Sequence, residues 1–484
     1  MSILRLLIRE LLTFVVAVFM LAFLISCSQT TAPQNASLVG VVRLINDTGD
    51  DNLDPIDFSG VTVSCYPFKV AVNGLQEAIA QYPQIGFNMD DRGFLLTIRE
   101  SPLLVSTSSS DGSYSVPKIA PGEWIVKFSK EAWGDRYFKV SIASSGEIIL
   151  DLEMFPPQIV SGSHDGDLVI QTNRELVING DFVLFGNIIA NGQGIVKISS
   201  NANVRVQGSI INNSGELLIV TSTNPQQNRY YRLELINPEH DVIYCLFSSA
   251  LTGLYVSSSA VDINVSHSMF YDCEAGYLSS MNSSVNVNNS IFAMCASEAS
   301  TVAALNQHSA SVEISRNIFI DNKIGLRSAD NASSTISDNY FLRNYVGAES
   351  SYQTQDVISY NTFIDNEFYA IRTASLRSCV IEYNDISGPG GIQNFWFTTP
   401  GQAPQIHNNN INAAIYAIYT SSQAAAQDVD AAMNYFYTTS IDELNQLIWD
   451  ENDRPLEYPT SYPAGYVIFV PYRTSRVVTA GIRY

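Results

Sequence analysis

The strongest constraint on this 484-residue chain is a short pattern that occurs nine times between Val242 and Phe436. Each copy places a small polar residue three positions after an aliphatic one and two positions before a large apolar one. The polar anchors lie 22 to 27 residues apart and are Cys245, Ser268, Ser290, Asn317, Asn339, Asn361, Asn384, Asn409 and Asn434. A unit of this length is too short to bury a hydrophobic face alone, so neighbouring copies are expected to stack into a solenoid.

The repeats favour strands over helices. Apolar and polar residues alternate in short runs such as Val312 to Ile314, and no window shows a sustained period of 3.6 residues. Stacked coils of strands lie about 4.8 Å apart, so each sequence position forms a column along the solenoid. Asn suits the anchor column because it tolerates a left-handed backbone and its amide both donates and accepts hydrogen bonds. The column of Phe two positions later is expected to stack in the interior.

These repeats resemble the right-handed parallel β-helix proteins of the pectin lyase-like superfamily, which includes many carbohydrate-active enzymes and the periplasmic NosD-type proteins. The specific features are the Asn-x-Phe-x-x-Asn units at 317–322, 339–344 and 361–366 and the glycines eight positions past their anchors, Gly276, Gly325 and Gly347. The resemblance covers about residues 156–472. It implies an all-β fold, with a right-handed parallel β-helix over 156–440 and a C-terminal closing segment over 441–484. Such a resemblance fixes the fold better than the function.

The N-terminus carries a targeting signal. Arg5 and Arg9 precede an apolar stretch from Leu11 to Ile25, and the following Ser26-Cys27 completes a sequence that resembles the lipobox of bacterial lipoproteins. The resemblance implies a signal peptide over 1–26, acylation of Cys27 and a lipid anchor in the bacterial cell envelope, at the outer membrane, in the periplasm or at the cell surface. An ordinary signal peptide or a single membrane anchor is the alternative, although the apolar run is short for a membrane span.

Between a polar tether at 27–36 and the repeats, residues 37–155 predict an N-terminal β-sandwich. Alternating segments occur at 38–42, 60–63, 107–114 and 121–128, separated by turn residues. Their order resembles the carboxypeptidase regulatory-like domain, a transthyretin-type sandwich; a generic sandwich is the alternative. The stretch from Ala71 to Pro102 departs from that pattern, and residues 75–81 suggest a short helix.

Open ends of a solenoid expose strand edges, which invite aggregation. We therefore expect the sandwich or its linker to cover the N-terminal end of the solenoid. We expect residues 441–472 to close the other end.

Charge limits the possible partners. The chain has a net charge of −21, and residues 27–484 carry −22, which argues against nucleic acid because phosphate binding needs clustered Lys and Arg. It also disfavours anionic polysaccharides bound without a metal. Acidic columns that bind calcium remain an alternative, but neither an EF-hand nor a glycine-rich nonapeptide occurs. We expect no metal and no cofactor.

Two cysteines share one column. Cys273 and Cys295 lie five positions after their anchors, so they are expected to be vertical neighbours, within the span of a disulfide. A pair of buried thiols is the alternative that we favour, since free Cys packs as a small hydrophobic residue. No cysteine pair has the spacing of a zinc site.

Catalytic motifs are hard to find. The five histidines fall on different parts of different coils, and neither the Arg-x-Pro-x-x-Arg nor the Gly-His-Gly motif of the related enzymes occurs. Asp321, Arg343 and Asp365 share the position four after the anchor on successive coils, which separates the two carboxylates by about 9 to 10 Å. A carboxylate pair near this distance suits an inverting hydrolase. The other interpretation is a charge ladder in which Arg343 keeps both carboxylates ionised.

Aromatic residues favour binding over catalysis. The middle coils carry Tyr340, Tyr345, Tyr352, Tyr360, Tyr369 and Tyr383. Phe395, Trp396 and Phe397 follow a glycine-rich stretch and are predicted to lie in a ligand-binding loop. We expect a noncatalytic lipoprotein, anchored to the membrane by its lipid, that binds a glycan or an envelope protein or has a structural role. The alternative is a polysaccharide lyase or glycoside hydrolase; the oligomeric state stays open.

Overall fold

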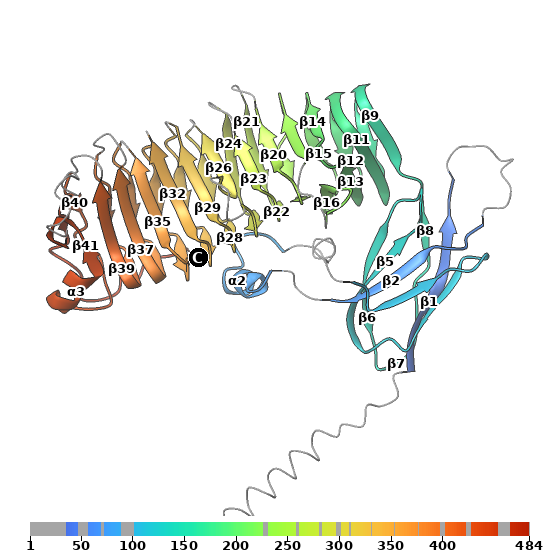
Figure 1. Ribbon diagram of the computed structural model, residues 1–484, viewed down its shortest axis with the longest axis horizontal. Coiled ribbons are helices and arrows are strands. Elements are labelled where there is room, and N and C mark those ends of the chain that lie inside the picture. Colours follow the sequence, from blue (N-terminus) through green and yellow to red (C-terminus); the bar gives the residue numbers. More distant parts are fainter. Residues whose placement is uncertain are drawn as a thin grey trace, which may run out of the picture.

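A computed structural model shows an all-β chain, in which a long solenoid is joined to two small sheets at its N-terminal end (Figure 1). It describes residues 35–46, 57–68, 72–88, 101–225, 231–257, 261–279, 283–296, 302–308, 311–330, 332–352, 354–375, 377–396, 402–422, 427–453 and 465–483. Cys27 and the whole targeting signal lie outside these ranges. Within the described residues, no helix is long and apolar enough to cross a membrane.

The coils of the solenoid stack as three walls of parallel strands, as the repeat predicts. The first wall is a sheet of ten strands: β18 (Val242–Ile243), β21 (Asp262–Ser266), β24 (Ser284–Asn288), β27 (Glu313–Ser315), β30 (Thr335–Ser337), β33 (Val357–Ser359), β36 (Val380–Glu382), β38 (Gln405–His407), β40 (Val429–Asp430) and β42 (Val467–Ile468). A shorter sheet of the earliest coils precedes it: β10 (Leu168–Ile170), β12 (Ile188–Ala190) and β15 (Ile210–Asn212).

The second and third walls share their longest strands, which turn the corner between them. The second wall contains β13 (Gly194–Ile198), β16 (Leu218–Ser222), β19 (Cys245–Ser248), β22 (Met269–Tyr271), β25 (Ile291–Ala293), β28 (Ile318–Ile320), β31 (Tyr340–Leu342) and β34 (Thr362–Ile364). The third contains β14 (Asn203–Val206), β17 (Arg232–Leu235), β20 (Thr252–Val256), β23 (Ala275–Ser279), β26 (Leu305–His308), β29 (Ile324–Ala329), β32 (Val346–Tyr352), β35 (Tyr369–Ser375) and β41 (Ile448–Trp449). The strands common to both are β9 (Gln158–Asp165), β11 (Arg174–Phe185), β37 (Asp385–Trp396) and β39 (Asn410–Ser422).

The predicted Phe column is confirmed. Six fully buried rings on the inner side of the second wall stack one above another, with centroids 4.5 to 5.0 Å apart and planes within 14° of parallel: Phe247, Phe270, Phe292, Phe319, Phe341 and Phe363. Offset stacking adds to the free energy that these rings gain by burial.

The Asn ladder is also confirmed, but its backbone differs from the prediction. The Asn339 side chain donates to the Oδ1 of Asn361 at 3.0 Å, and its own Oδ1 accepts from both the backbone and the side chain of Asn317. The same bonds continue through Asn384 and Asn409 to Asn434. The left-handed residue is not the anchor but the residue before it, as at Arg316, Asp338, Tyr360, Tyr383, Asn408 and Met433. Asn is therefore needed at the anchor for its amide rather than for its backbone freedom.

A second buried ladder runs five positions after the anchors. Asn322 donates to Asn344 and Asn344 to Asn366, while the backbone of Cys295 donates to Asn322 at 2.8 Å. Cys273 and Cys295 are buried free thiols at the head of this column. The thiol alternative is therefore the correct one, and each thiol bonds backbone carbonyls of its own coil and of the coil before it.

The N-terminal residues form two small sheets around one hydrophobic core. One sheet pairs β1 (Asn35–Leu44) with β4 (Ser113–Pro117), β7 (Ser145–Ile149) and β8 (Leu152–Met154). The other has the order β3 (Leu104–Thr107), β2 (Thr62–Pro67), β5 (Gly122–Ser129) and β6 (Arg136–Ile142). The strands β6 to β8 were not predicted. A half-buried Lys197 on the first coils binds Asp135 and Glu175, each at 2.9 Å, which ties these sheets to the solenoid.

The two ends of the solenoid are finished differently. At the C-terminal end, helix α3 (Ile441–Leu447) and the short helix η2 (Glu451–Asp453) follow the last coil, and Leu444 of α3 is fully buried in the solenoid core. Helix α3 therefore covers part of the core at this end. At the other end (Figure 1) the terminal strand is β9, which is mostly exposed and polar, with Ile159 62% exposed. The N-terminal sheets attach beside this strand and leave much of it uncovered.

The outer side of the second wall is covered by two segments of the same chain. Helix α2 (Leu75–Gln81), which matches the predicted short helix, and its flanking residues pack their apolar side chains on the outward residues of β16 to β31. The tail Arg473–Arg483 runs back over β39, β37 and β34. The two covers meet where Gln84 donates to the backbone oxygen of Arg483 at 3.1 Å, and Figure 1 shows α2 beside the C-terminus.

We predict that Asn339→Leu lowers the free energy of unfolding by about 2 to 6 kcal/mol. The substitution leaves two buried donors of Asn317 without their acceptor, and each unsatisfied group costs about 1 to 3 kcal/mol. Denaturant unfolding measures the change. The control is Asn412→Leu, which alters an exposed Asn of the same solenoid; equal stability of both variants would contradict the ladder.

Candidate functional site

The predicted charge column exists, but only one of its carboxylates is bound. Arg343 donates from Nε and Nη2 to the two oxygens of Asp321 at 2.8 and 2.9 Å. All three residues of the column, Asp321, Arg343 and Asp365, have left-handed backbones at the turn after the second wall. The register of the prediction is therefore correct, and Arg343 pairs with one neighbour instead of bridging both.

Arg343 also holds the N-terminal cover in place. Its Nη2 donates to the backbone oxygen of Asn73 at 2.6 Å, just before α2 begins. Nearby, Tyr82 of the same segment packs on Tyr340, with ring centroids 5.4 Å apart. The guanidinium thus joins the solenoid to a segment about 270 residues earlier in the chain. This arrangement fits a structural latch better than a catalytic acid and base pair.

The glycine-rich stretch before Trp396 is a strand and not a loop. Strand β37 continues through Gly388 to Gly391, and a Cβ at Gly390 or Gly391 would lie about 2 Å from a carbonyl oxygen of the adjacent coil. These glycines permit close stacking at the corner between walls. Phe395 is half-buried near the end of the strand, and Trp396 ends it, paired with Ser422. The side chain of Trp396 and all of Phe397 lie outside the described residues.

Aromatic rings gather on the outer side of the third wall. Tyr345 stacks on Phe368 at 5.2 Å, and Phe368 contacts Tyr369 edge to face at 4.4 Å. The group continues to Tyr419, 6.1 Å from Tyr369, and then to Trp449, 5.9 Å further. Tyr416 packs against both of these last rings. The rings come from the coils that begin at Asn339, Asn361, Asn409 and Asn434, a span of about 19 Å at the spacing of stacked strands.

Polar side chains continue the same outward column. In register along the third wall stand Tyr255, Leu278, Asn306, Arg327, Glu349, Arg372, Gln393, Tyr419 and Trp449. Glu349 is 5% exposed and lies between two arginines. Arg327 donates to one of its oxygens at 2.8 Å, and Arg372 donates to the other at 2.8 Å. One buried carboxylate is thus held by two guanidiniums beside a row of rings.

Lys323 adds a further positive charge at this surface, because its ammonium lies 3.7 Å from the centre of the Tyr345 ring. Such a cation over a ring face is attracted by the ring quadrupole. Arg327 and Arg372 flank the carboxylate of Glu349 on the same wall. The aromatic row is therefore bordered by fixed cationic side chains.

Part of this surface is predicted from the sequence, because Tyr345 and Tyr369 belong to the aromatic group of the middle coils. Tyr416, Tyr419 and Trp449 are not predicted, although Tyr419 and Trp449 are register partners in successive coils. The spacing of the second-wall anchors does not locate the equivalent positions of the third wall, because the turn between the two walls varies in length from coil to coil.

The histidines do not converge on one site. His308 bonds Asp330 at 2.7 Å, His407 bonds the backbone oxygen of Ala432, and His267 packs against Phe87 of the N-terminal cover. Across the described ranges, no group of three or more His, Cys, Asp or Glu residues is placed to hold a metal ion.

A family model described as a right handed beta helix region matches residues 226–356 and residues 300–434. Together with the three parallel walls, the match decides the architecture. The chain is a right-handed parallel β-helix repeat protein. No curated protein matches the chain.

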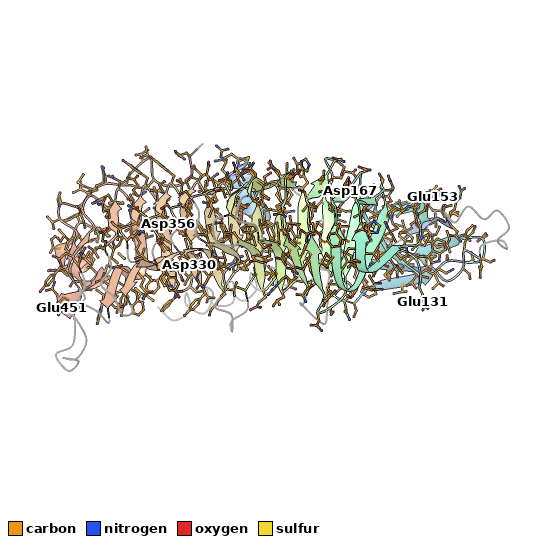
Figure 2. All side chains as sticks on the ribbon, turned by 90° about the horizontal axis from the view of Figure 1, so that it is seen from above. Glu131, Glu153, Asp167, Asp330, Asp356 and Glu451 are labelled. Carbon is orange, nitrogen blue, oxygen red and sulfur yellow. The ribbon has the colours of Figure 1, made fainter. Side chains whose placement is uncertain are left out.

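One carboxylate lies inside the β-helix. Asp356, labelled in Figure 2, is fully buried. Its oxygens accept from the backbone of Ser334 at 2.8 Å and from the hydroxyls of Ser328 and Ser350 at 3.0 and 2.7 Å. Burial raises the pKa of Asp356 from 3.8 to about 6, although these hydrogen bonds oppose the shift. The group is closed off from ligands and belongs to the polar interior of the turn.

Asp356 predicts a pH dependence of stability. Because its folded-state pKa lies above the ordinary value, the folded β-helix binds the proton more tightly than the unfolded chain, and this stabilisation is lost as the pH rises from about 4 to about 6. We expect the wild type to lose up to about 3 kcal/mol over that range relative to Asp356→Asn. Denaturant unfolding of both proteins between pH 4 and 7 measures the difference, and parallel curves would contradict it.

Proposed function

We propose that this β-helix protein is a noncatalytic carbohydrate-binding protein of the bacterial cell envelope, and that the outer side of its third wall holds the glycan. The observation that supports this most is the row of rings from Tyr345 to Trp449 beside the arginines that flank Glu349. Binding sites for small ligands and sugars combine aromatic surfaces with a few fixed polar groups. This wall has both.

The chemistry of the wall suits sugars. Tyrosine presents an apolar ring and a hydroxyl, so it contacts both the C–H face and the hydroxyls of a pyranose. The rings are within reach of solvent: Phe368 is 43% exposed, and Tyr416, Tyr419 and Trp449 are half-buried. Arg372 is fixed by Glu349, and its guanidinium carries more donors than this carboxylate uses. Donors held in place in this way lose little entropy when they bind a hydroxyl.

The runner-up is a polysaccharide lyase or glycoside hydrolase of the pectin lyase-like class, which the fold would also permit. Its best carboxylate pair is Asp321 and Asp365. Both oxygens of Asp321 accept hydrogen bonds from the guanidinium of Arg343, a contact that fits a structural ion pair better than a general acid. The contact of Arg343 with Asn73 further favours a structural role for this column.

We also propose the rest of the molecular organisation. Residues 1–26 are removed as a signal peptide, Cys27 is acylated, and the residues from Cys27 to the start of β1 at Asn35 tether the body to the membrane. The two N-terminal sheets, which begin at Asn35 rather than at residue 37, form a β-sandwich of the carboxypeptidase regulatory-like type, which serves as a spacer and an anchor for the β-helix. The shared core of the two sheets, which includes Val63, Trp124 and Phe128, supports this assignment.

Glycan binding is tested on the wild type and on substitutions of the row. We predict that Trp449→Ala and Tyr419→Ala each weaken binding of an oligosaccharide, found by array and measured by calorimetry, at least tenfold. Tyr437→Ala is the control, because Tyr437 is 42% exposed on a different turn. Trp396→Ala tests the position favoured by the sequence and is expected to weaken binding if its ring joins the row.

The same assay separates binding from catalysis. Asp321→Asn and Asp365→Asn are expected to leave glycan binding unchanged. Release of shortened products by the wild type, abolished by either substitution, would reject the noncatalytic function in favour of the hydrolase. Unchanged affinity in both Trp449→Ala and Tyr419→Ala would remove the third wall as the site.

The lipid anchor is tested at Cys27. Cys27→Ser is expected to leave the protein unacylated and in the soluble fraction, because no thiol remains to carry the lipid. Fractionation and metabolic labelling with a fatty acid measure this. Recovery of the variant in the membrane at the wild-type level would contradict lipidation.

A further inference from the structure

The C-terminal tail contacts the second wall as a bound peptide would. Residues 473 to 483 form no helix or strand, yet they contact five successive coils. At the first of these coils, the backbone N–H of Arg473 donates to the oxygen of Asn434 at 2.9 Å. At the last, the backbone N–H of Arg483 donates to Asp338 at 3.0 Å. The segment thus runs back along the solenoid axis for about 19 Å, four intervals between stacked strands.

The central contact recognises the peptide backbone. The Oδ1 of Asn410 accepts from the backbone N–H of Val477 at 2.8 Å, and its Nδ2 donates to the Val477 oxygen at 3.1 Å. This pair of bonds satisfies the backbone of one residue whatever its side chain, and the chain turns directly after it, because the backbone N–H of Ala480 also donates to the Val477 oxygen at 3.2 Å. Further along, the backbone N–H of Gly481 donates to the oxygen of Tyr383 at 2.8 Å, and that of Ile482 donates to the hydroxyl of Thr362 at 3.3 Å.

The side chains of the tail supply the specificity, through three arginines. Arg473 donates to the side-chain oxygen of Asn408 at 2.6 Å. Arg476 forms an ion pair with Asp385. Arg483 forms one with Asp338 and lies over the ring of Tyr360, 4.1 Å from its centre.

Two small anchors complete the recognition. Val477 and Ile482 are 6% and 7% exposed, so each fills a site on the wall. Between them the chain rises away from the surface, and Val478 is 95% exposed. The tail therefore lies on the wall through spaced contacts, and only its end, at Ile482, joins the hydrophobic cluster between α2 and the second wall.

The wall beneath the tail is built for a polar ligand. Along one outward column, Leu246, Met269, Ile291, Ile318 and Tyr340 are followed by Thr362, Asp385 and Asn410. The apolar half is covered by α2, and the polar half receives the tail. Asp338 and Asp385 give that half a negative charge that matches the arginines of the tail.

We infer that the polar half of the second wall is a peptide-recognition groove. The tail fills it in cis, and an arginine-bearing segment of another protein occupies it when the tail is released. The ligand chemistry is defined by the tail itself: two or three arginines that flank small apolar residues, in a backbone that Asn410 bonds and that turns directly after the bonded residue. Intramolecular attachment gives the tail a high effective concentration, so a ligand in trans must compete with it.

The test releases the tail while keeping the groove intact. In the full-length chain, Arg476→Glu and Arg483→Glu together reverse the two charges that meet Asp385 and Asp338. The probe is a fluorescein-labelled synthetic peptide with the sequence of residues 473–484. We expect saturable binding by the released variant, measured by anisotropy, and at least tenfold weaker binding by the wild type, whose own tail competes. The interaction is also expected to weaken as salt concentration rises.

Matched variants show whether the groove itself binds the probe. Asn410→Ala in the released variant is expected to weaken binding at least tenfold, whereas Asn412→Ala, an exposed residue of the same strand, leaves it unchanged. A probe with glutamate at the positions of Arg476 and Arg483 should not bind. Failure of the folded released variant to bind the probe, or equal binding of the reversed probe, would overturn the inference. Concentration-dependent dimers that the probe does not dissociate would assign the groove to a second copy and also overturn it.

A measurement on the wild type covers the case in which the released variant does not fold. Hydrogen exchange is expected to show the amides of Val477, Gly481 and Ile482 exchanging at least a hundredfold faster than the buried amide of Asn409. Such a difference reports local release of the tail without unfolding of the ladder. Equal protection of the tail and the ladder would make the tail an integral part of the core and would overturn the proposal.

Discussion

Parallel stacking at the strand spacing of about 4.8 Å places every residue directly above and below its counterparts in other coils. A position is therefore stable only if its side chain tolerates its neighbours in the column. Asn meets this condition because its amide donates to the next Asn and accepts from the previous one, and Phe meets it by stacking. A charged column must alternate in sign, which is the pattern of Arg327, Glu349 and Arg372 on the third wall.

The same constraint explains which parts of the fold could be predicted from sequence. Residues of one column recur in the sequence at intervals of one coil. The anchors, the Phe stack and the shared column of Asp321 and Arg343 could therefore be predicted from spacing alone. The left-handed residue before each anchor could not, because Arg316, Asp338 and Tyr360 share no residue type. Their backbone is imposed by the strands on either side of the turn. The anchor Asn was correctly identified but for a partly wrong reason, since its amide and not its backbone is what the coil requires.

Contacts between segments far apart in sequence have no period and were not predicted. Arg343 donates a hydrogen bond to Asn73, about 270 residues earlier in the chain. The sequence around either residue does not predict this contact. A signal for the cover was nevertheless present in the second wall. Leu246, Met269, Ile291 and Ile318 each precede an inward Phe, so both faces of these strands are apolar, as in strands buried on both sides. Such runs indicate that a second layer packs outside the coil, here α2 and its flanking residues.

The two covers of the second wall bear directly on where function can reside. On many solenoids an outer wall is a natural place for a ligand, but here α2 and the tail occupy the length of this wall from Leu217 to Met433. The apolar half is held by burial, which makes its cover part of the fold. The polar half is held by hydrogen bonds and ion pairs at a partly exposed surface, where water and salt compete with each contact. Because the two covers are held by different interactions, they are expected to behave differently. Helix α2 stays with the β-helix, whereas the tail is able to exchange. The aromatic surface lies on the third wall, which neither segment covers.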